Sequence, residues 1–153
     1  MATIEDYGSG RILRSIRLAH LALRFTALPL AGKYIRRNLE ERMEPFGIRP
    51  ITFAEAGRII HQSGHCAVGP RTCRSLFLES GNTESVFLDE LADRMVDAGK
   101  AVVVTADLAI EAIKKYPDNP LVLSKVSGRY LEICRSVPEV CIYWKMKRAG
   151  LDV

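Results

Sequence analysis

Four cysteines in two identically spaced pairs place the strongest constraint on how this chain folds. Six residues separate Cys66 from Cys73, six separate Cys134 from Cys141, and 60 residues lie between the two pairs. Each pair also encloses a proline, which holds the connecting chain in a fixed bend. A chain that doubles back over this distance brings all four sulfurs to one centre. The matched spacing therefore suggests two halves of one site.

Helical patterns account for most of the remaining sequence. Residues 52–62 begin with the Ser/Thr-x-x-Glu form of a capping box, and residues 84–98 carry apolar side chains at near-helical spacing before a glycine stop. Other helices are predicted over 12–27, 34–43, 105–115, from 121 to about 134, and from 136 onward. Residues 101–104 read as an extended connection or an edge strand. We expect a mostly α fold, a compact helical domain with loops that converge on a four-cysteine metal site.

The length of 153 residues suits one domain, or one compact domain with an appended segment. Charge is distributed unevenly along it. Residues 11–37 hold seven basic side chains and no Asp or Glu. We therefore expect a basic, apolar helical segment over 1–45 and a helical four-cysteine metal-binding domain over 46–153.

No long apolar segment is present in this N-terminal region. Its longest stretch without acidic or basic residues, Phe25–Gly32, has eight residues, far fewer than the roughly 20 that cross a bilayer. The first ten residues carry two acids and lack the basic region of a secretory signal. We expect a cytoplasmic protein, and cytoplasmic thiols are normally reduced rather than paired in disulfides.

Four thiolates in one set select either an iron–sulfur cluster or zinc. Structural zinc sites draw cysteines from pairs about two to four residues apart, whereas a cubane cluster is larger and accepts ligands from wider loops. The wider spacing in this chain therefore favours a cluster. Cationic side chains near the cysteines would stabilise an anionic cluster: Arg71, Arg74, Arg135 and Lys145.

The segments 65–74 and 134–141 resemble small four-cysteine iron–sulfur proteins of anaerobes, in which a Cys-Arg dipeptide is followed by a Cys-x-x-x-Pro-x-x-Cys-like pair. Those proteins more often show a closer C-x-C pair before the arginine, where this chain has Arg71 and Cys73. The resemblance implies a [4Fe–4S] cluster held by Cys66, Cys73, Cys134 and Cys141. The ligand run of common bacterial ferredoxins is absent from the sequence.

These observations predict an electron-transfer protein rather than a catalyst, with a larger redox protein or enzyme as its partner. His65 adjoins Cys66 and is a candidate to hydrogen-bond a cluster sulfur. Two alternatives remain open. One is an interaction protein stabilised by zinc, and the other is a redox sensor in which Cys66 and Cys73 exchange between dithiol and disulfide.

The basic helix expected over 12–27 also suits the surface of an anionic membrane, which would make the protein peripheral to it. Its arginines would meet the headgroups, while Leu18, Leu21 and Phe25 enter the acyl boundary. The alternative is a core helix whose arginines reach solvent. Aromatic residues make up only 7% of the chain, so we expect no nucleic-acid partner.

Overall fold

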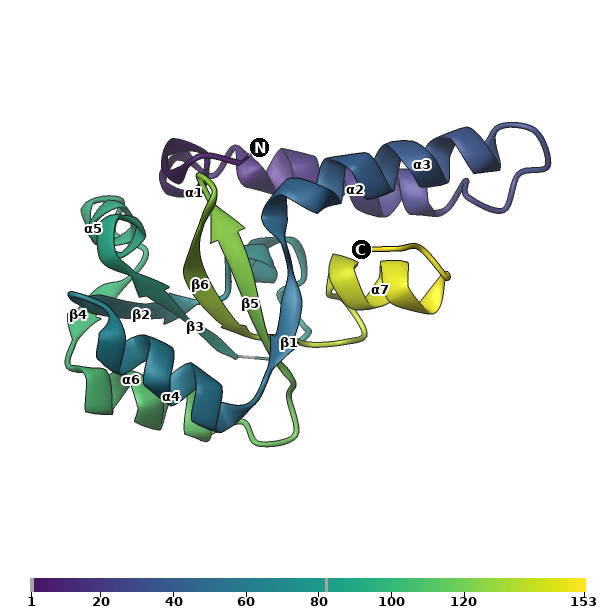
Figure 1. Ribbon diagram of the computed structural model, residues 1–153. Coiled ribbons are helices and arrows are strands. Elements are labelled where there is room, and N and C mark those ends of the chain that lie inside the picture. Colours follow the sequence, from purple (N-terminus) through teal and green to yellow (C-terminus); the bar gives the residue numbers. More distant parts are fainter. Residues whose placement is uncertain (1, 82) are drawn as a thin grey trace.

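A six-stranded antiparallel sheet forms the centre of the computed structural model, which describes residues 2–81 and 83–153 (Figure 1). Its strand order is β1-β5-β6-β3-β2-β4. The strands are β1 (Arg49–Ile51), β2 (Cys66–Pro70), β3 (Glu84–Leu88), β4 (Val102–Val104), β5 (Leu121–Val126) and β6 (Arg129–Arg135). The expectation of a mostly α fold is therefore wrong, and the chain is a mixed α/β protein.

Helices cover both faces of the sheet (Figure 1). On one face lie α4 (Phe53–Gln62) and α6 (Ala106–Lys114), and on the other lie α1 (Ile4–Ser9) and α5 (Asp89–Asp97). A hairpin of α2 (Ile12–Leu23) and α3 (Gly32–Met43) extends beyond the sheet, above α7 (Ile142–Arg148). Two short 3-10 helices, η1 (Glu44–Phe46) and η2 (Thr72–Leu76), complete the fold. None of the helices in the described residues is both long enough and apolar enough for a membrane span.

Strand register assigns side chains to the two faces, because successive residues of a strand point in opposite directions. Val86 and Ile133 are paired across β3 and β6 and are fully buried, in one cluster with Ile113 of α6. Burial of each such side chain contributes about 1.5–3 kcal/mol. Ser85 and Cys134, the adjacent pair in the same ladder, point to the opposite face. That face carries the polar and thiol groups described below.

The helix predicted over 84–98 is wrong in its first third. Residues 84–88 form β3, and the helix α5 begins only at Asp89. Because β3 is buried on both faces, four apolar or small residues follow one another without the alternation of a half-buried strand. The spacing of apolar residues in such a run does not distinguish a buried strand from a helix. The predicted stop is confirmed, since α5 ends at Asp97 and Gly99 has a φ of 66°.

The helix predicted from 121 to about 134 is also wrong, because this segment is the β5–β6 hairpin. Ser127 and Gly128 have φ values of 52° and 82°. Two consecutive residues with positive φ are the signature of the tight turn that joins twisted antiparallel strands. Gly128 therefore marks a turn and not a weakened helix. The last helix also starts later than predicted, with Cys141 as its N-cap.

Several other predictions are confirmed. Thr52 and Thr105 cap α4 and α6 through hydrogen bonds from backbone N–H groups to their hydroxyls. Helices α2 and α3 fall within or close to their predicted ranges, and 102–104 forms the edge strand β4.

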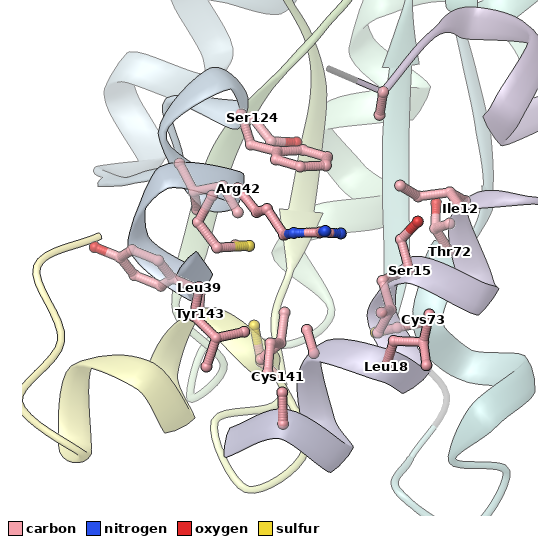
Figure 2. Close-up of a pocket in the computed structure, with 18 of the residues that line it drawn as sticks. Ile12, Ser15, Leu18, Leu39, Arg42, Thr72, Cys73, Ser124, Cys141 and Tyr143 are labelled. Atoms are coloured by element: carbon pink, nitrogen blue, oxygen red, sulfur yellow. The ribbon is translucent and has the colours of Figure 1, made fainter. Parts of the chain in front are cut away.

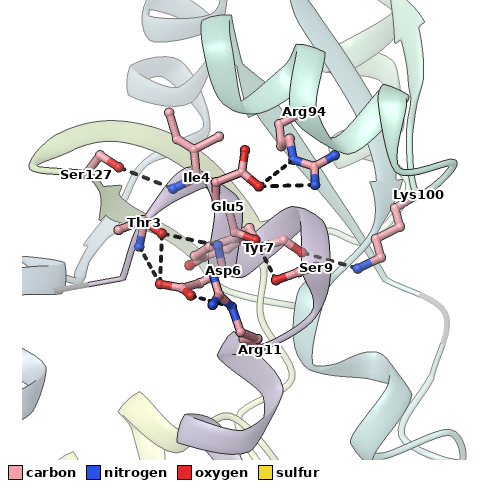
Figure 3. Close-up of polar contacts among 10 residues, drawn as sticks. All are labelled: Thr3, Ile4, Glu5, Asp6, Tyr7, Ser9, Arg11, Arg94, Lys100 and Ser127. Carbon is pink, nitrogen blue, oxygen red and sulfur yellow. Dashed lines mark hydrogen bonds and ion pairs between the residues drawn. The ribbon is translucent and has the colours of Figure 1, made fainter.

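Helix α1 is anchored to the sheet domain by the polar contacts drawn in Figure 3. Lys100 Nζ donates to the carbonyl oxygen of Gly8 at 2.8 Å, and Arg94 forms an ion pair with Glu5 at 3.2 Å. These contacts hold the helix in place. Tyr7 is buried against the sheet, where burial and the nearby Glu132 carboxyl group raise its pKa.

Candidate functional site: a pocket lined by three thiols

Three of the four cysteines line one pocket of about 710 Å³. Two of them, Cys73 and Cys141, are labelled in Figure 2. Cys134 lies on β6, Cys73 lies in η2 just after β2, and Cys141 caps α7. Cys73 and Cys141 both add to the rise in the pKa of Cys134, after the larger effects of burial and Glu132. The two distant segments therefore contribute three cysteines to the same pocket, whereas the sequence led us to expect four sulfurs around one centre.

Cys66 is not part of this group. It pairs with Leu88 in the β2–β3 ladder, whereas Cys134 pairs with Ser85, three residues earlier on β3. An odd separation along a strand places the two side chains on opposite faces of the sheet. The Cys66 thiol is buried and donates to the carbonyl oxygen of Val104 at 3.5 Å. The structure thus brings together three thiols of the predicted four.

Burial raises the pKa of all three pocket thiols. The pKa of Cys73 rises to about 11, and that of Cys134 lies well above its usual range because burial is reinforced by the nearby Glu132 carboxyl group. The pKa of Cys141 is raised by burial but is held down by the amides of Trp144 and Tyr143 and by Arg71. The thiols are accordingly protonated at neutral pH, and a metal that bound them would displace protons.

Arg71 is the predicted cationic residue that the structure places beside the thiols. It is only 1% exposed, and its guanidinium donates to Cys73 Sγ at 3.9 Å and to Thr83 Oγ1 at 3.1 Å. Further donor contacts go to Ser80 and Gly81. Within residues 2–81 and 83–153, no carboxylate lies within 4.0 Å of Arg71. A buried cation without a paired carboxylate favours an anionic group nearby.

None of the three predicted cofactor-binding residues, Arg71, Arg74 and His65, lines the pocket itself, and Arg71 is the one that contacts a pocket thiol. Arg74 is part of η2 and is half-buried outside the pocket wall. His65 lies before β2, where its Nε2 is 2.8 Å from Asp93 Oδ1. The structure therefore places His65 in an ion-pair arrangement with α5 and away from the three thiols.

Glu132 is a pocket residue that the sequence reasoning missed. It is 5% exposed, and it lies two positions before Cys134 on the same face of β6. Its carboxyl group accepts hydrogen bonds from three hydroxyls: Thr72 Oγ1 at 3.2 Å, Ser85 Oγ at 3.3 Å and Ser124 Oγ at 3.2 Å. Burial raises the pKa of Glu132 against these donors. In the sequence, Glu132 stands between two apolar residues. This pattern points to a buried polar site only if residues 129–135 are recognised as a strand.

Apolar side chains from the helical hairpin form the remaining wall of the pocket. Figure 2 shows the guanidinium of Arg42, on α3, extending into this space opposite Ser15 of α2. The apolar lining includes Ile16, Leu18, Ala19, Leu21, Ala22, Phe25, Ile35 and Leu39. The pocket therefore has a polar floor, formed by Glu132 and Cys134 on β6 with Cys73 of η2 and Cys141 before α7, and an apolar wall on α2 and α3.

The pocket thiols do not form a single-ion site. In the part of the chain that the structure describes, no three His, Cys, Asp or Glu side chains stand close enough to hold one metal ion. Comparison with protein families, with curated proteins and with solved structures finds no match to this chain.

Proposed function

We propose that this protein is an iron–sulfur protein that transfers electrons, with its cluster held by Cys73, Cys134 and Cys141. The observation that carries the proposal is the convergence of these three thiols, from segments 60 residues apart, on one pocket beside Arg71. Soft thiolate ligands select iron–sulfur clusters or zinc. The proposed partner is a larger redox protein or enzyme, as the sequence led us to expect.

The residues present suit a cluster better than a zinc ion. Zinc requires its thiolates about 2.3 Å from one centre, and the described residues contain no arrangement of that kind. A cluster is larger, so its thiolates stand farther apart. When bound it would supply one-electron transfer, and its negative charge would be balanced by Arg71. Cys66 is left out of this ligand set because its thiol lies on the other face of the sheet.

A thiol-based redox sensor is supported less well. Such a sensor attacks through the thiolate, and thiols with raised pKa are poor nucleophiles at neutral pH. Burial raises the pKa of Cys66 as well as that of Cys73. In addition, Cys66 and Cys73 do not meet, since Cys66 bonds to β4 while Cys73 faces the pocket.

The test is anaerobic purification, followed by reconstitution with iron and sulfide. We expect a brown protein with acid-labile sulfide and a broad visible absorbance that bleaches on reduction. Cys73→Ser, Cys134→Ser and Cys141→Ser should each lose this absorbance, while Cys66→Ser serves as the matched control and should keep it. A colourless protein after reconstitution would overturn the proposal. Equal loss in all four variants would overturn the three-thiol ligand set.

The apolar wall of the pocket favours a second function, the binding of a small, largely apolar molecule that carries an anionic group at one end. A volume of about 710 Å³ lies within the usual range for ligand sites, roughly 300–1,000 Å³. Arg42 gives the ligand's anionic end a partner inside this space. An anilinonaphthalene sulfonate dye combines both features and should bind with enhanced fluorescence. Ala19→Trp would fill the wall, and unchanged dye binding in that folded variant would count against this second function.

A further inference from the structure

The loop between α2 and α3, residues 24–31, is here called the hairpin tip. Figure 1 shows it at the far end of the two helices, away from the sheet. Its large apolar side chains face solvent, with Leu30 at 95%, Leu28 at 48% and Phe25 at 46% exposed. Grouped exposure of this kind on a projecting loop marks an interaction site.

Positive charge surrounds the hairpin tip. Arg24 is the first residue of the tip, Lys33 follows two positions after its end, and both are exposed. Residues 11–37 contain no Asp or Glu. Among the described residues, neither Arg24 nor Lys33 has a carboxylate within 4.0 Å. Exposed apolar side chains next to two exposed cations complement a surface that carries negative charge on its outside and is apolar beneath.

The conformation of the tip is held by its own backbone. Gly32 N–H donates to the carbonyl oxygen of Leu28 at 2.9 Å, and Thr26 Oγ1 donates to that of Leu23 at 2.8 Å. A Cβ atom at Gly32 would overlap the carbonyl oxygen of Thr26, so the close return of the chain needs glycine at that position. The leucines are therefore presented outward before any partner binds, which reduces the entropy lost on binding.

We propose that the hairpin tip inserts into an anionic lipid bilayer. Phe25, Leu28 and Leu30 enter the acyl boundary, while Arg24 and Lys33 contact the lipid phosphates. The proposed contact centres on this loop, next to the helix face considered in the sequence, whose Leu18 and Leu21 are also exposed. A second copy of the chain is a poorer occupant, because its identical tip would bring like charges together. The proposal does not depend on the iron–sulfur cluster.

Vesicle co-sedimentation tests the proposal with the full chain. The probes are vesicles of phosphatidylcholine alone and of phosphatidylcholine mixed with phosphatidylserine. We expect binding to the mixed vesicles only, with loss of binding at high salt. The double variant Arg24→Gln with Lys33→Gln should bind about 30-fold more weakly, because it loses the attraction of two positive charges to the lipid headgroups. Leu28→Ser with Leu30→Ser should weaken it at least about tenfold. Leu108→Ser, an exposed leucine of α6, is the matched control and should bind normally.

A fluorescence measurement separates insertion from simple adhesion. Tryptophan introduced as Leu30→Trp should shift its emission to the blue and be quenched by brominated lipid, whereas Leu108→Trp should show neither change. Absence of binding by the folded wild-type chain overturns the proposal, as does full binding by both tip variants. The proposal would also be overturned if the chain formed concentration-dependent dimers that the tip variants abolish and that vesicles do not disrupt. The tip would then be a contact between two copies of the chain.

Discussion

Cys66 and Cys134 belong to the same sheet but point to opposite faces of it. Cys66 on β2 lies two strands away from Cys134 on β6, and its partner Leu88 is three residues along β3 from Ser85, the partner of Cys134. The two positions are therefore roughly 10 Å apart along the strands and about 10 Å apart across them. No side-chain rotation brings the two sulfurs together through a sheet.

Cys66→Ser should therefore affect stability without affecting the proposed cluster. Serine keeps a donor for the carbonyl oxygen of Val104 but buries a more polar group, so we expect a loss of about 1 kcal/mol in the free energy of unfolding. Urea denaturation measures this loss. The visible absorbance of the reconstituted variant should match that of the wild type, and its disappearance from folded protein would assign Cys66 to the ligand set.

Arg71→Gln should lower the reduction potential of the proposed cluster. The guanidinium places a buried positive charge 3.9 Å from Cys73 Sγ, and positive charge near a cluster favours its reduced, more negative state. Removal of the charge therefore makes reduction harder. Redox titration followed by visible absorbance measures the shift. Arg74→Gln is the matched control, since Arg74 is a cationic residue only three positions away in η2, whereas the contact to Cys73 Sγ comes from Arg71. An equal shift in both variants would contradict a specific role for Arg71.

Gly69→Ala and Gly57→Ala should change stability in opposite directions. A Cβ atom at Gly69 would overlap the carbonyl oxygen of Lys100 and lie 3.1 Å from the Cα atom of Ala101. The backbone must shift to admit it, at a cost of about 1–3 kcal/mol. Gly57 lies inside α4, where the nearest atom, Cδ1 of Ile110, is 3.8 Å away. Alanine at that position should stabilise the helix by about 0.5–1 kcal/mol.

Thermal and urea unfolding of the two glycine variants measure these changes. Equal stabilities would mean that the close approach of β2 to the chain around Lys100 is not present in solution.

Local signals allowed several elements to be predicted from the sequence. Thr52 and Thr105 begin helices because their hydroxyls accept a backbone N–H, which is a property of a few neighbouring residues. The strands were missed for a tertiary reason. Buried β3 lacks alternation, and Gly128 is equally compatible with a poor helix and a tight turn until the pairing of β5 with β6 is known.

The candidate site was predictable only in part for the same reason. Cysteine spacing predicted that four thiols converge on one centre, and three of them, Cys73, Cys134 and Cys141, line the same pocket. It could not exclude Cys66, because the face on which Cys66 lies depends on the register of β2 against β3. Glu132 was hidden by the helical assignment of its strand.

His20 should make the folded protein sensitive to acid. Its ring packs edge-on against Phe77 at a centroid distance of 4.9 Å, and its Nε2 atom is buried without a hydrogen-bond partner in the described residues. Burial, together with the charge of Lys145, lowers the pKa of His20 from 6.5 to about 4. The unfolded chain therefore takes up a proton first as the pH falls. The stability associated with neutral His20 is complete above pH 6.5 and is lost progressively as the pH falls toward about 4.

Urea denaturation across this pH window measures the effect of His20. His20→Leu cannot take up a proton, so its free energy of unfolding should depend less on pH than that of the wild type between about 4 and 6.5. His61→Gln is the matched control, because the side chain of His61 is 57% exposed, and it should keep the wild-type pH dependence. Identical pH profiles for His20→Leu and the wild type would show that His20 is protonated in the folded protein as readily as in the unfolded chain. The packing of α2 against Phe77 would then have to be looser than the structure shows.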